Sequence, residues 1–350
     1  MLTQVRIVGS GLIGTSIALA LTGRGVSTHL VDSDQSAADL ANALTGNVVA
    51  DSPQLVILAL PTSAIPQVID AEFSLNPKAT FMDVGSVKTE PLVHIRASKL
   101  PLAQFVPTHP MAGREIGGAQ SARADLFMTR SWVITPTSET SANSLALVEE
   151  FIELMGASSV TLTPEEHDRA VAAISHLPQI TATLLAQTLS DVTENWMELA
   201  GSGLRDTTRI AASDPQLWSE IIYSNREEIS RLATKMHSEL GKLIEHLENK
   251  EAIEKFIHRG GVGRSRIPGK HGGKAREYTF LPIVIDDKPG QLAAIFNECA
   301  AVGVNVEDLN IEHSPGQQSA LITLALSASD ANSLSDHLSA IGWNVHPILK

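Results

Sequence analysis

The sequence predicts an α/β fold: a doubly wound, mostly parallel sheet, followed by an all-helical domain and a small α+β domain. Two patterns carry this prediction. Over residues 1–163, short apolar runs alternate with helical segments, which is the pattern of βαβ units. Over residues 164–257 the strand pattern gives way to long amphipathic segments, and short strands return only in residues 278–350. We therefore expect three domains, with residues 258–277 as a linker.

The composition is that of a soluble globular protein. Of the 350 residues, 43% are hydrophobic and 19% are charged, and the length allows two or three cores. Neither a transmembrane run nor a signal-peptide pattern is evident, so we expect no membrane partner and a cytoplasmic location. The net charge of −13 argues against nucleic acid as a partner. The single cysteine, Cys299, provides neither a disulfide nor a metal cluster, and we expect no metal.

Six apolar runs mark the strands that we expect in the first domain. They are Gln4–Val8, Thr28–Val31, Leu55–Leu60, Thr80–Val84, Ser131–Ile134 and Ser159–Leu162. In a doubly wound sheet the carboxyl ends of the parallel strands line the ligand crevice. The segments that directly follow these runs are therefore the first candidates for a functional site.

A glycine-rich loop follows the first strand and opens a helix at Leu12–Leu21, in the pattern GxGxxG. In this setting the loop presents backbone N–H groups and the positive end of a helix to a pyrophosphate. Gly9 permits the tight turn, Gly11 lets the phosphate approach, and Gly14 lets the helix pack closely on the strand. This combination predicts a Rossmann-type dinucleotide-binding domain. The cofactor contacts expected from the loop are Gly9, Gly11, Leu12, Ile13 and Gly14.

An aspartate ends the second expected strand, at the position that the dinucleotide-binding pattern requires. Asp32 lies about 20 residues beyond the loop, where its carboxylate can accept hydrogen bonds from the hydroxyls of the adenosine ribose. Asp34 adds a second negative charge, and no basic residue follows for several positions. A 2′-phosphate would be repelled there, so the sequence favours NAD over NADP.

Further polar residues follow expected strands at the same edge of the sheet. Pro61 and Thr62 end one strand, and they either flank the nicotinamide half of the cofactor or form an ordinary turn. Ser86 and His109 lie in two other loops at this edge. A lone histidine is more often structural than catalytic, but a position at the predicted crevice, with Ser86 in the adjacent loop, favours a catalytic role for His109.

The second domain begins with a strong helix start. Thr163 is the expected N-cap, Pro164 takes the first helical position, and Glu165 and Glu166 place acidic groups in the first turn. A long amphipathic helix is expected at Glu227–Leu247. Because helical arrays with this much apolar surface often bury a face in a partner subunit, we expect a homodimer.

Five short motifs occur in a fixed order along the first two domains. They are Gly-Ser-Val-Lys at 85–88, Thr-His-Pro-Met-Ala-Gly at 108–113, Ser-His-Leu-Pro at 175–178, Arg-Asp-Thr-Thr-Arg-Ile-Ala at 205–211 and Ser-Asp-Pro-Gln-Leu-Trp at 213–218. Together they resemble the prephenate and arogenate dehydrogenases, and the resemblance spans roughly Val5 to Leu247. It implies NAD-dependent oxidative decarboxylation of prephenate, or of arogenate, on the route to tyrosine.

The resemblance also implies roles for individual residues. His109 would accept the proton of the substrate hydroxyl, and Ser86 would hydrogen-bond that hydroxyl or His109. Arg209 matches the arginine that binds a substrate carboxylate, for which a guanidinium is well suited. His176 lies in a helix that the proline of its motif should kink, which could turn the side chain toward the crevice. Trp218 is either a core residue or a substrate contact.

The chain departs from the family pattern at two points. Gln179 stands where many members have a second histidine, and Arg114 stands where a small hydroxyl residue is common. Glu115 is a candidate to meet the ammonium group of arogenate, or else it pairs with Arg114. These departures leave the choice between prephenate and arogenate open.

The linker and the last domain suggest regulation. The linker is rich in glycine and basic residues, and it is either a solvated tether or it folds against the acidic body near the substrate cleft. The last domain has the order βαββαβ of a ferredoxin-like unit. Its expected elements are Phe280–Ile285, Pro289–Val302, Asn305–His313, Ser319–Leu326, Asp330–Ile341 and Trp343–Leu349. With an Asp-Lys-Pro-Gly turn at 287–290 it resembles an ACT domain, which implies control by an aromatic amino acid, tyrosine first, or else a dimerisation module that binds nothing. The expected effector contacts are Gly290, Gln291, Leu292 and Asn305.

Two other functions compete with this interpretation. A β-hydroxyacid dehydrogenase shares the domain plan, but it needs a catalytic lysine and asparagine that are not evident near Ser175–Gln187. A non-enzymatic sensor of NAD and amino acids would keep the glycine loop and the last domain. The sensor gives no reason for His109, Ser86 and Arg209 to occur together.

Overall fold

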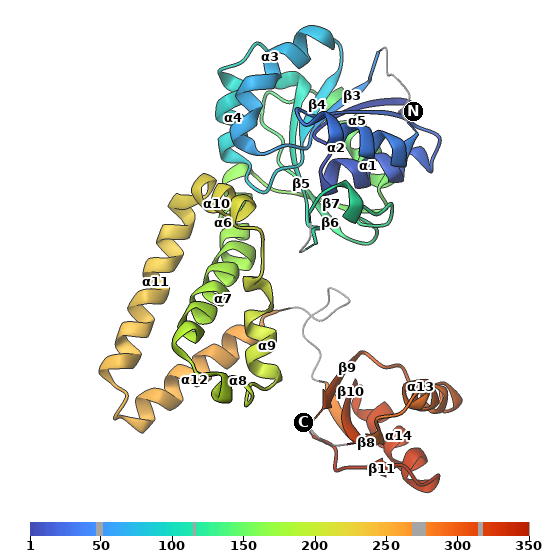
Figure 1. The fold of residues 1–350 in the computed structure, drawn as a ribbon, viewed down its shortest axis with the longest axis vertical. Helices are drawn as coiled ribbons and strands as arrows, with labels where there is room; N and C mark the ends of the chain where they lie inside the picture. The colour runs from blue at the N-terminus through green and yellow to red at the C-terminus, as the bar shows by residue number, and fades with distance from the viewer. Residues whose placement is uncertain (47–51, 115–116, 268–277, 314–317, 350) are drawn as a thin grey trace. The chain divides into compact units, whose positions relative to one another are not determined.

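The computed structural model describes residues 1–46, 52–114, 117–267, 278–313 and 318–349 (Figure 1). The chain divides into two compact units, Met1–Ser238 and Glu239–Lys350. The first unit holds the expected sheet domain and most of the helical region. The second holds the end of the helical region and the small carboxyl-terminal domain.

Seven strands of the described residues form one sheet in the order β2-β1-β3-β4-β5-β6-β7. The strands are β1 (Gln4–Val8), β2 (Ser27–Val31), β3 (Leu55–Leu58), β4 (Thr80–Asp83), β5 (Phe105–Pro110), β6 (Ser131–Ile134) and β7 (Ser158–Thr161). Strands β1 to β5 are parallel to one another, whereas β6 pairs with β5 in the antiparallel direction and β7 runs parallel to β6. The predicted Rossmann-like, mostly parallel sheet is confirmed.

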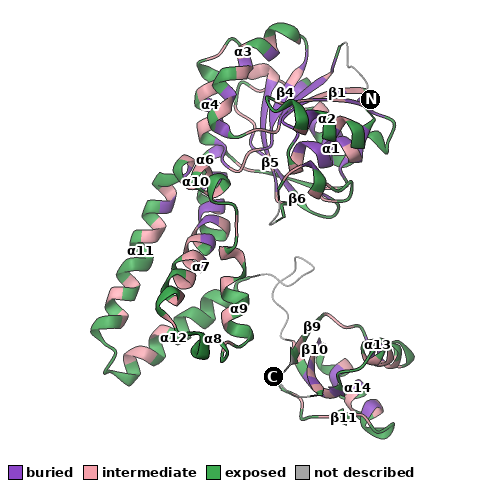
Figure 2. Cartoon of the chain, in the orientation of Figure 1, coloured by how far each residue is buried: buried purple, intermediate pink, exposed green. Residues whose placement is uncertain are grey.

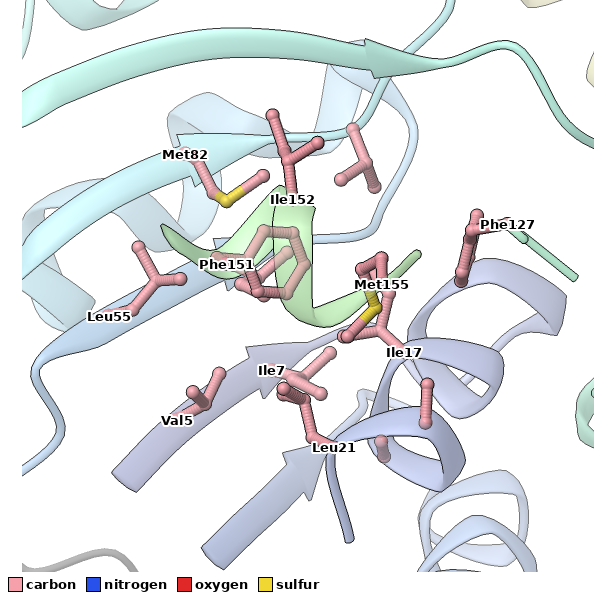
Figure 3. Close-up of a cluster of buried hydrophobic side chains, with 14 of the residues drawn as sticks. Val5, Ile7, Ile17, Leu21, Leu55, Met82, Phe127, Phe151, Ile152 and Met155 are labelled. Atoms are coloured by element: carbon pink, nitrogen blue, oxygen red, sulfur yellow. The ribbon is translucent and has the colours of Figure 1, made fainter. Parts of the chain in front are cut away.

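Helices cover both faces of this sheet (Figure 1). They are α1 (Leu12–Thr22), α2 (Gln35–Thr45), α3 (Ile65–Leu75), α4 (Thr89–Arg96) and α5 (Ala142–Leu154). On one face, Ile17 of α1 and Phe151 of α5 pack on Ile7 of β1 in a single cluster (Figure 3). On the other face, residues of α3 and α4 such as Ile69 and Ile95 form a second cluster with the strands. The central strand β3 is continuously apolar because both of its faces are buried.

The helical region begins where the sequence predicts it. Thr163 and Glu166 form a reciprocal capping box at the start of α6 (Pro164–Val171). A π-helical turn at Ala172–His176 separates α6 from the next helix, so the helix is locally widened just before Pro178. The following helices are α7 (Leu177–Gln187), α8 (Glu194–Met197), α9 (Ser202–Thr208), α10 (Pro215–Ser224) and α11 (Arg226–Glu245). Within the described chain, no helix is long and apolar enough to cross a membrane.

One predicted boundary was wrong. The linker was expected to begin at residue 258, but helix α12 (Lys250–Ser265) continues through the first part of it. Asn249 caps this helix and an ion pair between Glu251 and Lys255 supports its first turns. The helix then continues through three glycines despite their low helix propensity. Residues 268–277, with the rest of the basic linker, lie outside the described part of the chain.

Four strands of the second unit form an antiparallel sheet in the order β11-β8-β10-β9, within the residues that the structure describes. The elements follow the predicted order βαββαβ, which is the ferredoxin-like arrangement. They are β8 (Thr279–Asp286), α13 (Gln291–Ala301), β9 (Asp308–His313), β10 (Ser319–Leu326), α14 (Ala328–Ala340) and β11 (Asn344–Val345). Ile295 of α13 and Leu334 of α14 pack with Ile283 and Leu324 of the sheet in a separate core.

Candidate active site

The glycine loop has the shape that a dinucleotide requires. Gly9 has a φ of +109°, and a Cβ there would lie 2.1 Å from the carbonyl oxygen of Ala59. A Cβ on Gly14 would lie 2.0 Å from the carbonyl oxygen of Gly9. Around Gly11, by contrast, no described atom comes within 4 Å of such a Cβ, and no described side chain caps the start of α1. The N–H groups at the helix start thus face open space beside Gly11, which suits a pyrophosphate.

Asp32 lies beside this loop at the end of β2. Its Oδ2 accepts hydrogen bonds from the backbone N and the hydroxyl of Ser10, at 2.7 and 2.8 Å, and its Oδ1 accepts one from the backbone N of Asp34 at 3.0 Å. Burial opposes ionisation of Asp32, but these hydrogen bonds hold its pKa below the usual value. Asp34 caps α2 with its own side chain. The end of β2 beside the glycine loop is therefore anionic.

The turn after β3 lies next to the turn after β4. Thr62 is buried at the start of a 3₁₀ turn, and its hydroxyl lies 3.6 Å from the position of a Cβ on Gly85. Pro61 is exposed just before it. Ser63 donates to the carboxylate of Glu220 in α10, at 2.9 Å to Oε2. This contact joins the strand edge of the sheet to the helical region of the same unit.

A fully buried lysine supports the loop that carries Ser86 and the end of β5 that carries His109. The Lys88 ammonium is 0% exposed and bonds to the carboxylate of Asp83 and to the carbonyl oxygen of Thr108. Burial raises the pKa of Asp83 and lowers that of Lys88, while the attraction between the two charges opposes both shifts. The hydroxyl of Thr108 accepts a hydrogen bond of 2.9 Å from Trp132 and fixes the end of β5 from the other side.

His109, on β5, is partly exposed and touches the helical region. Its Nδ1 lies 2.8 Å from Nε2 of His167 in α6, and Nδ1 of His167 lies 2.8 Å from Oδ1 of Asp168. Burial first, and then repulsion by His167, Lys88 and His176, hold the pKa of His109 well below its usual value. The imidazole is therefore neutral near pH 7 and can accept a proton.

Asp168 connects α6 with the start of α4. Its carboxylate accepts hydrogen bonds from the backbone N of Lys88 at 2.8 Å and of Thr89 at 2.9 Å, and also from the Thr89 hydroxyl. Burial opposes ionisation of Asp168, but these bonds and the one from His167 keep its pKa below the usual value. A buried carboxylate therefore stands behind the two histidines.

His176 is buried in the same region, 1% exposed. Its Nδ1 lies 3.1 Å from the amide nitrogen of Asn225, which also donates to the carbonyl oxygen of Asp168 at 2.8 Å. The His176 ring meets the half-buried Trp218 ring edge to face, with centroids 6.1 Å apart. Burial lowers the pKa of His176 to about 4, although Asp168 pulls in the other direction.

Gln179 holds the turn that carries Arg209. The buried amide of Gln179 donates to the carbonyl oxygen of Ile210 at 2.9 Å, and the hydroxyl of Ser213 donates to the same oxygen at 2.6 Å. Arg209 begins this 3₁₀ turn, Arg209–Ala211, and its side chain is exposed. In this position Gln179 has a structural partner that the sequence did not reveal.

The remaining predicted residues have different outcomes. Among the described residues Ser86 makes no hydrogen bond to His109, so of its two expected roles only the contact with the substrate hydroxyl stays a prediction. Glu115 lies outside the described residues, while Arg114 is exposed and donates to the carbonyl oxygen of Ser121 at 3.0 Å. In the second unit, Gly290 has a φ of +91° directly before Gln291 and Leu292 in the first turn of α13, and Asn305 donates to Glu307 at 3.2 Å. The described residues contain no group of three or more His, Cys, Asp or Glu that could hold a metal.

Sequence reasoning missed three residues of this site. They are His167, Asp168 and Asn225. His167 contacts His109, Asn225 contacts His176, and Asp168 contacts both His167 and Asn225. A signal for the first two was present: they stand together in the first turns of a strongly capped helix, on the face that also carries the buried Val171. A polar pair on a buried helical face needs partners, and these partners lie in the strand loops.

Comparison with known proteins identifies the family. Residues 17–169 match the family model for the nucleotide-binding domain of prephenate dehydrogenase, and residues 163–259 match the model for its dimerization domain. A probable prephenate dehydrogenase, NovF of Streptomyces niveus, is 30% identical over 353 residues, which covers 96% of this chain and 98% of NovF. Prephenate dehydrogenase of Bacillus subtilis (strain 168) is 26% identical over 94% of each chain.

Solved structures agree with this result. The structure of prephenate dehydrogenase from A. aeolicus in complex with hydroxyphenyl propionate and NAD+ matches 77% of this chain and 99% of its own, with a TM-score of 0.65 and 27% identity. Arogenate dehydrogenase from Synechocystis matches 75% of this chain and 99% of its own, with a TM-score of 0.63 and 28% identity. The chain belongs to the prephenate dehydrogenase family.

Proposed function

We propose that this chain is a NAD-dependent prephenate dehydrogenase, which converts prephenate to 4-hydroxyphenylpyruvate by oxidative decarboxylation in tyrosine biosynthesis in the cytoplasm. Membership of the family and the names of its relatives support the proposal. The observation that carries it is the neutral, partly exposed His109 at the carboxyl end of β5, at the same edge of the sheet as the glycine loop. Formation of NADH from prephenate tests it directly.

The glycine loop and Asp32 fit NAD. Gly11 leaves room for the pyrophosphate beside the uncapped start of α1, and the anionic Asp32 favours ribose hydroxyls over a 2′-phosphate. Leu12 and Ile13 continue the loop into the helix, and Pro61 and Thr62 would flank the nicotinamide half. NAD, when bound, supplies the acceptor for the hydride that leaves the substrate carbinol carbon.

His109 is the base that we propose. It takes the proton of the substrate hydroxyl, and the carbonyl group forms as the hydride leaves the same carbon. The electrons of the bond to the departing carboxylate then complete the aromatic ring and CO₂ is released. The ketone oxygen becomes a phenolate in this step and takes the proton back from His109, which gives the hydroxyl group of the product. Because the ring becomes aromatic, this step needs no metal or covalent nucleophile. Ser86, half-buried in the adjacent loop, would hold the hydroxyl in line with His109.

Arg209 would bind one substrate carboxylate. Its exposed guanidinium suits a carboxylate, and the turn behind it is fixed by Gln179. His176 and Trp218 would form the wall next to the substrate ring, since both are packed together beside the His109 network. A substitution of Arg209 by Gln should raise the KM for the substrate with little change in the KM for NAD.

Arogenate is the second candidate substrate. The similarity to Synechocystis arogenate dehydrogenase supports it. Gln179 also supports it, because this neutral side chain adds no cation where arogenate would bring an ammonium group. Glu115 would be the partner of that ammonium. The ratio of turnover with the two substrates decides between them.

The helical region would form the dimer interface. Its match to a dimerization domain supports this, and so do the large hydrophobic side chains that it exposes, among them Leu184, Leu240 and Ile244. Most of α11 is exposed or intermediate in Figure 2. A hollow on this surface is lined by mostly apolar residues of α7 and its neighbours, among them Leu177, Ala182 and Met236. We expect Met236→Glu to shift the protein from dimer to monomer in analytical ultracentrifugation, and Lys235→Glu, at the next position, to leave the dimer intact.

The carboxyl-terminal domain would be an ACT-like regulatory domain. Its ferredoxin-like strand order supports this, as does the turn at Gly290 that opens α13. Gln291, Leu292 and Asn305 would contact an aromatic amino acid, tyrosine first. Calorimetric titration of the full chain with each aromatic amino acid tests the idea, and the absence of heat together with unchanged kinetics would contradict it.

The domain boundaries remain part of the proposal. We assign residues 1–163 to NAD binding, 164–257 to the substrate and the dimer, and 278–350 to regulation. The end of α12 at Ser265 moves the start of the linker from residue 258 to about 266.

A further inference from the structure

We propose that His167 and Asp168 are positioning residues that determine which nitrogen of His109 is free to accept a proton. The inference rests on the proposed function, because it concerns the base of that reaction. It is carried by the row of hydrogen bonds from Asp168 through His167 to His109.

The three side chains form one continuous row. Oδ1 of Asp168 lies 2.8 Å from Nδ1 of His167, and Nε2 of His167 lies 2.8 Å from Nδ1 of His109. The two imidazole rings are inclined by 71°, with their centroids 5.1 Å apart. Both distances are those of normal hydrogen bonds, so each nitrogen in the row needs either a proton or a lone pair that matches its neighbour.

The Asp168 carboxylate determines which nitrogen donates and which accepts in each hydrogen bond of the row. An ionised carboxylate only accepts hydrogen bonds, so Nδ1 of His167 must carry a proton. In neutral His167 the other nitrogen, Nε2, is then a bare acceptor. Nδ1 of His109 must therefore carry the proton that bonds to it, and Nε2 of His109 is left with its lone pair free. A free imidazole in water prefers the opposite arrangement, with the proton on Nε2, so the row reverses the intrinsic preference of His109.

The far end of the row is held in place. The Asp168 carboxylate is fixed by the backbone N–H groups of Lys88 and Thr89, at 2.8 and 2.9 Å, and by the Thr89 hydroxyl. His167 is 0% exposed, so no water competes for its nitrogens. The donor and acceptor roles along the row therefore have little freedom to reverse.

The same row stabilises the product of proton transfer. When the O–H bond of the substrate breaks, an N–H bond forms at Nε2 of His109 and the ring becomes a cation. Lys88 and His176 repel that cation. The negative charge of Asp168 reaches it through the polarisable ring of His167, while the Nδ1 proton of His109 stays between the two rings. This arrangement follows the same logic as the acid that orients the histidine of a catalytic triad.

A purely structural role is the alternative. Asp168 also joins α6 to α4, and a simple tie of this kind would affect stability but not the protonation of His109. The two roles differ in one observable, the position of the proton on the His109 ring.

NMR of the full chain labelled with ¹⁵N in its histidines measures that position. The signals of His109 are assigned by their loss in His109→Asn. We expect a protonated Nδ1 and a bare Nε2 in the wild-type protein near pH 7.5. In His167→Asn, which loses the acceptor for His109, we expect the proton to move to Nε2 in a large share of the molecules. A proton on Nε2 of His109 in the wild type, or an unchanged pattern in His167→Asn, would overturn the proposal.

Kinetics provide the matched comparison. The longer His167→Gln can place its carbonyl oxygen where Nε2 stands and still accept from His109, whereas His167→Asn is too short to reach it. We expect His167→Asn to lower kcat by about 100-fold or more, and His167→Gln by about tenfold or less. The KM for NAD should stay within about threefold in both, because neither touches the glycine loop. The exposed His246→Asn is the control, with wild-type kcat.

The outcomes separate the proposal from the proposed function. Equal kcat losses in His167→Asn and His167→Gln, with lowered stability in both, would favour the structural tie. A different result is that the wild-type protein turns over neither substrate and still shows the predicted protonation of His109. This result would support the role of His167 and Asp168 and contradict the proposed function.

Discussion

The carbonyl oxygen of Gly9 lies 2.0 Å from the position that a Cβ on Gly14 would take. No real Cβ tolerates this distance from a backbone oxygen, so Gly14 must be glycine for packing alone. Gly9 must be glycine because its φ is +109° and a Cβ there would lie 2.1 Å from the carbonyl oxygen of Ala59. At Gly11, between them, no described atom lies within 4 Å of a Cβ. The loop therefore contains two kinds of glycine. Gly9 and Gly14 are needed for the fold, whereas Gly11 leaves space for the cofactor.

Substitution by alanine should separate these two effects. We expect Gly14→Ala to reduce the free energy of unfolding by about 1–3 kcal/mol, because the loop must shift to admit the methyl group. Gly11→Ala should leave stability unchanged and weaken NAD binding by about tenfold or more, equivalent to about 1.4 kcal/mol. Chemical denaturation and NAD titration measure the two quantities. Equal NAD affinity in Gly11→Ala and wild type would contradict the assignment.

The buried pair of Lys88 and Asp83 should be sensitive to the loss of one partner. We expect Lys88→Met to destabilise the protein by about 3–5 kcal/mol, because it leaves the Asp83 carboxylate buried without its counter-ion. The double variant Lys88→Met with Asp83→Asn removes both charges and should recover most of that loss. Denaturant unfolding of the three proteins provides the comparison. A double variant as unstable as Lys88→Met would show that the charge of Asp83 is not the cause.

Acid should destabilise the fold through its buried histidines. The pKa of His176 is lowered to about 4, and that of His109 is also lowered, so the folded protein resists protonation where the unfolded chain accepts it. The unfolded chain therefore binds more protons as the pH falls from about 6.5 to about 4. The free energy of unfolding is highest above about pH 6.5, the pKa of histidine in the unfolded chain, and it decreases as the pH falls to about 4. His176 alone accounts for about 3 kcal/mol of this decrease. Unfolding curves at several pH values measure this.

A variant tests the assignment to His176. His176→Gln cannot be protonated in this range, so its stability should fall less steeply between pH 6.5 and 4 than that of the wild type. The exposed His246→Asn should show the wild-type slope. Identical slopes in His176→Gln and the wild type would assign the acid sensitivity to other groups.

Replacement of His109 should stop the chemistry and spare the cofactor. We expect His109→Asn to lower kcat by about 10²–10⁴-fold, because the proton acceptor is lost. The affinity for NAD should be nearly unchanged, since the glycine loop and Asp32 are intact. Stopped turnover with full NAD binding would separate an enzyme from a sensor, whereas near-normal turnover would mean that another group is the base.

Local patterns in the sequence predicted the parts of the site that depend on chain neighbours. The glycine loop, Asp32 and the loop of Ser86 each follow a strand directly, and His109 lies near the carboxyl end of β5. The topology of a doubly wound sheet brings these strand ends to one edge. The start of α6 was predicted for the same reason, because a capping box lies within four residues.

Contacts between distant segments were not predictable in this way. The bond between His109 and His167 joins residues that are 58 positions apart, and the bond between Lys88 and Asp168 spans 80 positions. Nothing in the local sequence sets that pairing. The end of α12 was misjudged for the opposite reason: its glycines indicate a break, yet the helix continues through them to Ser265.

The most direct test of the account is the rate of NADH formation by the purified protein with prephenate and with arogenate, each with NAD⁺ and with NADP⁺. We predict turnover with NAD⁺ and prephenate that far exceeds turnover with NADP⁺. A higher rate with arogenate than with prephenate would mean that arogenate is the substrate, while the proposed mechanism would stay the same. Turnover of neither substrate would contradict the proposed function.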